Sequence, residues 1–297
     1  MPTPEFSTLR YETHDRKAYL TLARPERLNA INDDMPGDIR RAVEYANDDP
    51  GVHVIVLGGD GKAFCAGYDL KQYAEGDPGA RWTQGEVWDP IADYKQMKRN
   101  SDDFFSLWRS LKPTICRVQG HAVAGGSDIA LSCDLVVMAE DARIGYPPAR
   151  IWGCPTTAMW VYKLGAEKAK RMLFTGDTID GVTAADWGLV LEAVPAAQLD
   201  ARVEQLADRI AGVPRNQLAM QKLMINQAYD NMGLHSTQVL ATLFDGITRY
   251  SPEGQWFAKF AQERGFHEAV AHRDSGSWLP DGGGELPPRS GAEGSGR

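Results

Sequence analysis

The chain has 297 residues, of which 43% are hydrophobic, so it is long enough to bury a sizeable core in one large domain or two small ones. Its 40 acidic residues outnumber its 32 basic ones, and the net charge of −8 argues against a general nucleic-acid-binding or anionic-membrane-binding surface. Local basic sites for a phosphate group are compatible with this balance, so we expect a small-molecule substrate and neither nucleic acid nor membrane as a partner.

The four cysteines are Cys65, Cys116, Cys133 and Cys154, and they show no paired spacing. They fit the reduced thiols of a cytoplasmic protein better than a disulfide framework or a zinc site. The six histidines are scattered without ligand spacing, so we expect no metal. The first ten residues lack a signal-peptide pattern, and no apolar run approaches transmembrane length.

The predicted elements begin with two strands, Phe6–Thr13 and Lys17–Leu22, joined by a polar turn. A helix follows, capped near Asn32 and running to about Asn47. The apolar run Val52–Leu57 is typical of a buried strand that ends at a glycine-rich turn. Short strands that alternate with helices indicate an α/β layered fold.

Two small-residue turns follow predicted strands. The first, Phe64–Asp69, comes after Val52–Leu57, and the second, His121–Asp128, comes after a predicted strand at Thr114–Val118. Glycine and alanine in both turns let a ligand approach the backbone closely. Two such turns can aim two backbone N–H groups at one carbonyl oxygen, which indicates an oxyanion hole for chemistry on an activated acyl group. Each turn alone is also compatible with an ordinary glycine turn.

The segment between these turns contains a long predicted loop, Glu75–Asp93, which is rich in Gly and Pro and carries Trp82 and Trp88 among charges. A predicted helix at 98–111 follows it. Beyond the second turn, helical patterns cover 156–164, 166–174, 199–211, 216–231 and 234–247.

At these motifs the chain resembles the crotonase superfamily, also called the enoyl-CoA hydratase/isomerase family. The resemblance runs from about Phe6 to about Phe266, in the family's order and near its spacing. The matching segments are Arg24–Ala30, Phe64–Leu70, Gly120–Asp128, Ser132–Leu135, Gly145–Pro147, Phe174–Asp177 and Ala184–Val190.

The resemblance implies an α/β fold, a crotonase-like spiral of ββα repeats, with a helical C-terminal region that makes trimers, often paired into hexamers. We therefore expect residues 1–198 to form the spiral core with the acyl-CoA site and residues 199–272 to form the helical region. Residues 273–297 are expected to be a disordered tail, because Gly, Pro, Ser and charge dominate there.

The resemblance also assigns the binding residues. The amides of the oxyanion hole fall on Tyr68 and Gly125, and Tyr68 also borders the acyl pocket. Coenzyme A enters as part of the thioester substrate, with no tightly bound cofactor, and is contacted by Arg27, Lys71 and the backbone around Cys65, Ala66 and Gly125. Trp82 and Trp88 are expected to wall the acyl pocket, the alternative being a loop pinned to the surface by its aromatic side chains.

In the family's hydratases two glutamates transfer protons. The first position is Asp128 here, a carboxylate one methylene shorter, whose alternative role is to cap a helix. The second position is Pro148, which cannot transfer a proton. Tyr146 is a candidate hydrogen-bond or proton donor and Arg150 a candidate partner for a substrate carboxylate; a packed aromatic and a surface ion pair are the alternatives.

The expected function is therefore that of an enoyl-CoA hydratase/isomerase-family enzyme that stabilises a thioester enolate, with Asp128 as single acid/base. Two alternatives remain: a crotonase-fold hydrolase of C–C or thioester bonds, and a catalytically silent acyl-CoA-binding protein.

Overall fold

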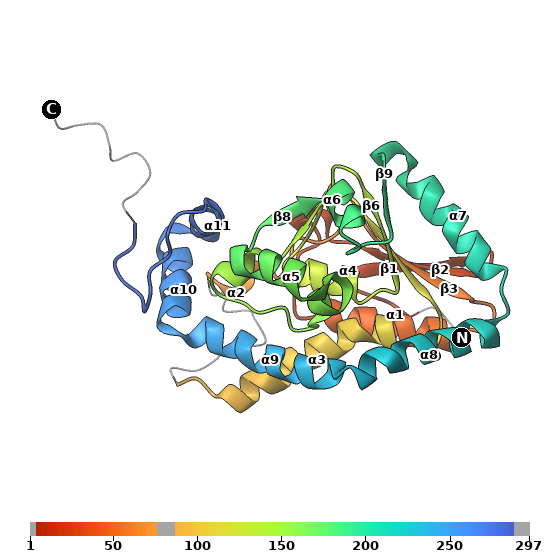
Figure 1. Ribbon diagram of the computed structural model, residues 1–297, viewed down its shortest axis with the longest axis horizontal. Helices are drawn as coiled ribbons and strands as arrows, with labels where there is room; N and C mark the ends of the chain where they lie inside the picture. The colour runs from red at the N-terminus through yellow and green to blue at the C-terminus, as the bar shows by residue number, and fades with distance from the viewer. Residues whose placement is uncertain (1–3, 76–86, 288–297) are drawn as a thin grey trace.

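The computed structural model describes residues 4–75 and 87–287, which form two β-sheets followed by a long run of helices (Figure 1). The strands are β1 (Leu9–His14), β2 (Lys17–Leu22), β3 (Val54–Gly59), β4 (Thr114–Val118), β5 (His121–Val123), β6 (Leu135–Ala139), β7 (Arg143–Gly145), β8 (Thr178–Asp180) and β9 (Glu192–Val194). The α-helices are α1 (Met35–Asp48), α2 (Leu70–Tyr73), α3 (Pro90–Arg109), α4 (Gly125–Leu131), α5 (Met159–Thr175), α6 (Gly181–Asp186), α7 (Leu199–Ala211), α8 (Arg215–Asn231), α9 (Leu234–Tyr250), α10 (Pro252–Arg264) and α11 (Phe266–Asp274). Short 3-10 turns are η1 (Pro25–Arg27), η2 (Pro147–Arg150) and η3 (Ala196–Gln198).

The larger sheet has the strand order β1-β2-β3-β4-β6-β9, and only β1 and β2 pair antiparallel in it. The smaller sheet has the order β5-β7-β8. Along the chain, β4 and β6 enter the larger sheet, and each is followed by a strand of the smaller one. The chain therefore winds through both sheets in successive turns, which confirms the spiral α/β fold with a helical C-terminal region.

The apolar runs explain the central strands. Every residue of β3 is buried, as expected for a parallel strand covered on both faces. The predicted strands Lys17–Leu22 and Thr114–Val118 are confirmed at both ends. The third strand starts at Val54 rather than Val52, because the Val52 N–H closes a turn on the Asp49 carbonyl at 3.2 Å.

Helix α5 covers two stretches that the sequence separates into two helices. Gly165 divides them, with φ +74° and ψ 171°, a conformation open to glycine and strained for other residues. The helical axis is therefore broken at the residue where the sequence pattern changes.

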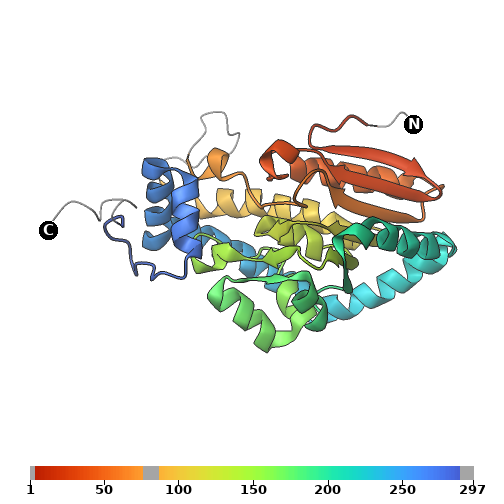
Figure 2. The same cartoon turned by 90° about the horizontal axis from the view of Figure 1, so that it is seen from above.

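The C-terminal helices extend the molecule away from the larger sheet. In both views α10 and α11 lie at the end opposite β1–β3, with α9 leading to them (Figures 1 and 2). Here a second hydrophobic cluster joins α10 and α11 to two core segments, through Ala74 after α2 and Ile151 after η2. The C-terminal helices thus pack against the segment that follows the first predicted functional turn and against the segment that follows η2.

Part of the expected tail is held against this cluster. Leu279 and Leu286 pack on it, and the Trp256 indole donates to the Glu285 carbonyl at 3.2 Å. Residues 288–297 lie outside the described residues. None of the helices in the described parts of the chain combines the length and the apolar character needed to cross a lipid bilayer.

Candidate active site

The two small-residue turns lie side by side. The Cys65 N–H donates to the His121 carbonyl at 2.9 Å, and the Val123 N–H donates back to the Cys65 carbonyl at 3.1 Å. A Cβ at Gly126 would collide with that same Cys65 carbonyl. The sequence folds this way because glycine at the start of α4 leaves room for the first turn.

On the side of the first turn, Gly67 lies close to the backbone of the second turn. Its φ is +90°, and a Cβ there would lie 2.8 Å from the Cβ of Ala124 and 3.5 Å from the Gly125 nitrogen. Ala124 itself has a positive φ of 52°. The second turn is therefore held in a conformation that costs on the order of 1–3 kcal/mol for a non-glycine residue.

The backbone N–H groups of Tyr68 and Gly125 belong to these two adjoining turns. Around the first turn, the Ile31 N–H donates to the Gly67 carbonyl at 2.8 Å, and the Ile31 carbonyl accepts from the Asp69 N–H at 2.9 Å. These two bonds lie on either side of Tyr68 and do not use its N–H. Within the described parts of the chain, neither N–H donates to a protein acceptor. The Tyr68 ring lies against Gly125, since a Cβ on Gly125 would be 3.0 Å from Tyr68 Cε2.

Asp128, the last residue of the second turn, lies in the first turn of α4 and is 2% exposed. Its Oδ1 accepts a hydrogen bond from the Thr157 hydroxyl at 2.5 Å. Burial raises the pKa of the Asp128 carboxyl to about 7; the bonds from Thr157 oppose the rise and the charge of Asp245 adds to it. A carboxyl with a pKa near neutrality is suited both to give and to take a proton.

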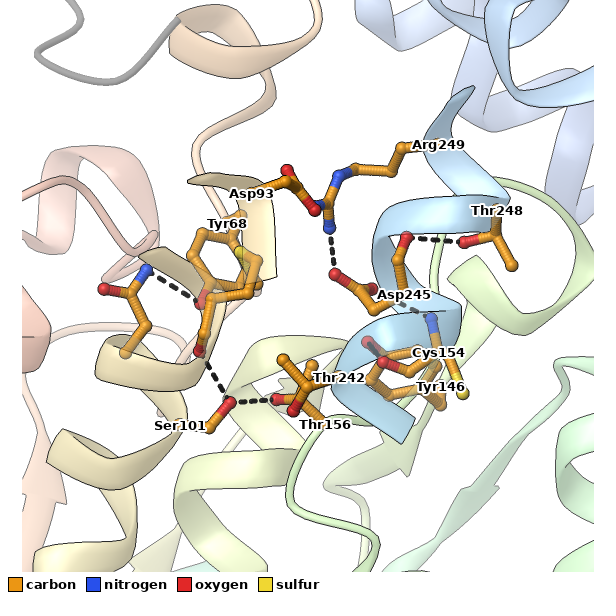
Figure 3. A network of polar contacts seen from close by, with 12 residues as sticks. Tyr68, Asp93, Ser101, Tyr146, Cys154, Thr156, Thr242, Asp245, Thr248 and Arg249 are labelled. Carbon is orange, nitrogen blue, oxygen red and sulfur yellow. Dashed lines mark hydrogen bonds and ion pairs between the residues drawn. The ribbon is translucent and has the colours of Figure 1, made fainter. Parts of the chain in front are cut away.

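The segment 151–158, which carries Thr157, is fixed by polar contacts from two helices (Figure 3). From α3, the Ser101 hydroxyl donates to the Thr156 hydroxyl at 2.7 Å. From α9, the Gln238 amide donates to the Thr157 carbonyl at 3.0 Å, and Asp245 Oδ1 accepts from the Cys154 N–H at 3.0 Å. The partner of Asp128 is therefore positioned by helices distant in sequence.

A buried ionic group that sequence reasoning missed lies beside this segment. Arg249 on α9 pairs with Asp245 on the same helix and with Asp93 on α3, the latter at 2.7 Å (Figure 3). Both carboxylates are almost fully buried. The signal in the sequence is a polar stripe on α9 at helical spacing, formed by Gln238, Thr242, Asp245 and Arg249.

Tyr146 and Pro148 lie next to this group. The Tyr146 hydroxyl donates to the Cys154 carbonyl at 2.9 Å, and burial holds its pKa well above the ordinary range. Its proton is thus already committed to the backbone. A Cβ at Gly153 would contact Pro148 Cβ at 2.8 Å and both Asp245 Oδ1 and Tyr146 Cε1 at 3.6 Å. Asp245 therefore stands close to the position where the resemblance places the missing glutamate.

A family model described as Enoyl-CoA hydratase/isomerase matches residues 12–254. This chain belongs to that family. The crystal structure of an enoyl-CoA hydratase from Mycobacterium smegmatis is similar to it at 48% identity and a TM-score of 0.86, over 91% of this chain and 94% of that one. An enoyl-CoA hydratase/isomerase from Xanthobacter autotrophicus Py2 is 30% identical, with a TM-score of 0.83 over 91% and 98%. A hydroxycinnamoyl-CoA hydratase-lyase from Pseudomonas fluorescens is 32% identical over 65% of this chain and 69% of that protein.

These similarities make the chain an enzyme of the hydratase/isomerase family and leave its particular reaction open.

The positions expected to contact coenzyme A surround the first turn. Arg27 and Lys71 are exposed, and the Ala66 N–H donates to the carbonyl of Leu28, next to Arg27, at 3.1 Å. Burial raises the pKa of the Cys65 thiol to about 12, so only its backbone is available to a ligand.

The expected acyl-pocket residues of this family member are only partly brought together. Trp88 is half-buried, stacks on Tyr250 of α9 with ring centroids 5.0 Å apart, and lines a pocket of about 230 Å³ with Asp93 and Thr242. Arg150 lies elsewhere: its guanidinium donates to the carbonyls of Arg273, Thr175 and Ser277. Trp82 lies outside the described residues. Among the described residues no cluster of three or more His, Cys, Asp or Glu is placed to hold a metal ion.

We expect Gly67→Ala to destabilise the enzyme, because the new Cβ meets Ala124 and the backbone stays at φ +90°. The cost should be about 1–3 kcal/mol, measured by urea denaturation. Gly37→Ala on α1 is the control, since a Cβ there meets nothing within 4 Å. Equal stability of the two variants would contradict the close packing of the turns.

The raised pKa of Asp128 also makes stability depend on pH. The native state holds this proton more tightly than the unfolded chain, so the stabilisation is full at low pH and is lost as pH rises from about 4 to about 7. Over about three pKa units, wild type should lose about 4 kcal/mol relative to Asp128→Asn. Denaturation of both proteins from pH 4 to 8 measures this, with exposed Asp141→Asn expected to follow wild type. If the free energy of unfolding of wild type and of Asp128→Asn changed with pH in the same way, burial would not be what keeps the Asp128 carboxyl protonated.

Proposed function

We propose that this enzyme converts an acyl-CoA thioester through an enolate whose oxygen is bound by the backbone N–H groups of Tyr68 and Gly125. Asp128 is the acid/base that moves the proton at the α-carbon. The observation that carries the proposal is the combination of two adjoining turns with uncommitted N–H groups and one buried carboxyl whose pKa lies at about 7.

The environment of the turns supports oxyanion binding. Cys65 and Ala122 join the turns in a parallel bridge, and the Cys65 side chain is fully buried, so the backbone there is rigid. Rigid donors need no reorganisation when negative charge develops, and removing one such donor typically costs a rate factor of about 10²–10³. The small residues that build the turns leave the N–H groups open to a ligand oxygen.

Coenzyme A is part of the substrate in this proposal, and no other tightly bound cofactor is invoked. The exposed cations of Arg27 and Lys71 lie beside the turn that would receive the thioester, where they are available to phosphate groups. The half-buried Tyr68 ring borders the acyl group. Family membership and the buried acid together favour an enzyme over a silent binding protein.

The exposed face of the C-terminal helices supports a homotrimer or a dimer of trimers. On α9 the exposed apolar residues are Leu240, Leu243, Phe244 and Ile247, at the spacing of one helical face. On α8 they are Met220, Leu223, Met224 and Ile225. An apolar stripe of this kind on a soluble surface marks a contact with another protein, here a second copy of the chain.

A cytoplasmic location is part of the same proposal. All four cysteines are free, and three of them are fully buried. Free thiols fit a reducing compartment.

The chemistry is tested with a panel of acyl-CoA and enoyl-CoA thioesters in heavy water. Wild type should exchange the α-proton of at least one thioester. Asp128→Asn should slow that exchange by about 10²–10⁴-fold and still bind the thioester, because the amide keeps the shape of the site but cannot take a proton. Asp141→Asn should exchange normally. Unchanged exchange in Asp128→Asn would remove Asp128 from the mechanism, and a wild type that exchanges no thioester would overturn the enolate proposal.

The assembly is tested by light scattering at micromolar concentration. Wild type should have the mass of three or six chains. Phe244→Glu should lower that mass by placing a charge in the apolar stripe, whereas Phe174→Glu, at an exposed phenylalanine on α5, should not. A monomeric wild type would refute the proposal.

A further inference from the structure

Resting on the enolate chemistry proposed above, we infer that Asp245 is a second proton-transfer group of this site, supplied by α9. It exchanges a proton with the water or hydroxyl group at the β-carbon of the substrate, while Asp128 serves the α-carbon. The enzyme is thereby equipped to hydrate an enoyl thioester despite Pro148.

The placement of Asp245 carries the inference. Asp245 is 4% exposed, and its Oδ1 lies near Gly153: a Cβ there would be 3.6 Å from that oxygen, 3.6 Å from Tyr146 Cε1 and 2.8 Å from Pro148 Cβ. Figure 3 shows its carboxylate joined to the Arg249 guanidinium and lying between Tyr146 and Cys154 on one side and Tyr68 on the other side of the view. Its charge contributes to the raised pKa values of Tyr68, Asp128 and Tyr146.

The carboxyls of Asp128 and Asp245 have partners of different charge. Asp128 is hydrogen-bonded by the Thr157 hydroxyl and pairs with no cation among the described residues. Asp245 accepts the Cys154 N–H and pairs directly with the Arg249 guanidinium. Burial raises the pKa of its carboxyl, and these two contacts, which favour the ionised form, oppose the rise. A pair of carboxyls in unlike environments is the usual arrangement of an acid and a base. Asp128 is then the proton donor and Asp245 the ionised acceptor.

Asp93 shows that Asp245 does more than neutralise Arg249. Asp93 already contacts the guanidinium through both carboxylate oxygens, at 2.8 and 2.7 Å. One carboxylate would balance the buried cation, and the second leaves a net negative charge in the interior. Asp93 lies on the α3 side, where it contacts Gly246 near Trp88. The extra carboxylate is the one that faces Tyr146.

The proposed hydration conserves atoms and electrons. The water oxygen bonds to the β-carbon while Asp245 takes one water proton, and the electron pair of the C=C bond moves onto the thioester oxygen as an enolate. The enolate collapses as Asp128 gives its proton to the α-carbon. A proton then passes from Asp245 to Asp128 through solvent, so one water has been added and both groups are restored.

The experiment compares Asp245→Asn with Asp93→Asn in the full-length protein, using an enoyl-CoA thioester panel. Each variant removes one carboxylate from Arg249 with a change of similar size, so loss of structure should affect both alike. Asp245→Asn should lower kcat for hydration by about 10²–10⁴-fold, with KM and α-proton exchange of the saturated acyl thioester near wild type. Asp93→Asn should keep hydration within about tenfold of wild type.

Rescue separates a chemical role from a structural one. Adding Pro148→Glu to Asp245→Asn returns a carboxylate to the neighbouring position and should raise hydration at least tenfold over Asp245→Asn alone. The inference is overturned if Asp245→Asn hydrates like wild type, if both aspartate variants lose hydration equally, or if rescue fails. It is also overturned if wild type exchanges α-protons but hydrates no thioester, a result that leaves the enolate proposal standing. A wild type that does neither would overturn both.

Discussion

The close contact between the turns at Gly67 and Gly125 is the constraint on which the rest of the site depends. It requires two sheets to meet, because β3 leads into one turn and β5 into the other. The bridge between Cys65 and Ala122 joins them, and glycine at 67 and 126 removes the side chains that would separate them. The position of Tyr68, the start of α4 and the direction of Asp128 all follow from that contact.

Helix α9 connects this local arrangement to the rest of the chain. A surface helix usually buries its apolar face and exposes its polar face, and α9 does the reverse. Its polar residues Gln238, Thr242 and Asp245 are buried, while Leu243 and Phe244 are exposed. The buried polar face fixes the segment that bonds Asp128, and the exposed apolar face is available to another subunit. One helix therefore links the geometry of the two carboxyls proposed to be catalytic to the surface proposed for assembly.

The features that could be predicted from the sequence are those that depend on a short stretch of consecutive residues. The turn at Gly67, the turn at Gly125 and the acidic residue at 128 are short motifs, and the structure places the two turns side by side. Asp245 was not predictable as a neighbour of Pro148, because helices α5 to α8 and strands β8 and β9 separate the two in the chain, and their proximity depends on how α9 is rotated about its axis. Arg150 shows the same limit, since its sequence neighbourhood does not reveal that three distant carbonyls take its guanidinium. The polar stripe on α9 was the one available signal.

Strain and buried charge are concentrated where the chemistry is proposed. Of the seven described non-glycine residues with positive φ, five lie in segments around the turns and Asp128: Leu28, Asn29, Ala124, Trp152 and Ala158. Each such residue, like a buried carboxyl without a cation, costs free energy that a protein selected for stability alone would avoid. Two packed cores hold them in place, the main one beneath the turns and the smaller one formed by α10, α11, Ala74 and Ile151. The C-terminal helices therefore contribute rigidity as well as surface, because the second core holds Ala74, which follows the first turn, and Ile151, which begins the segment that carries Thr157.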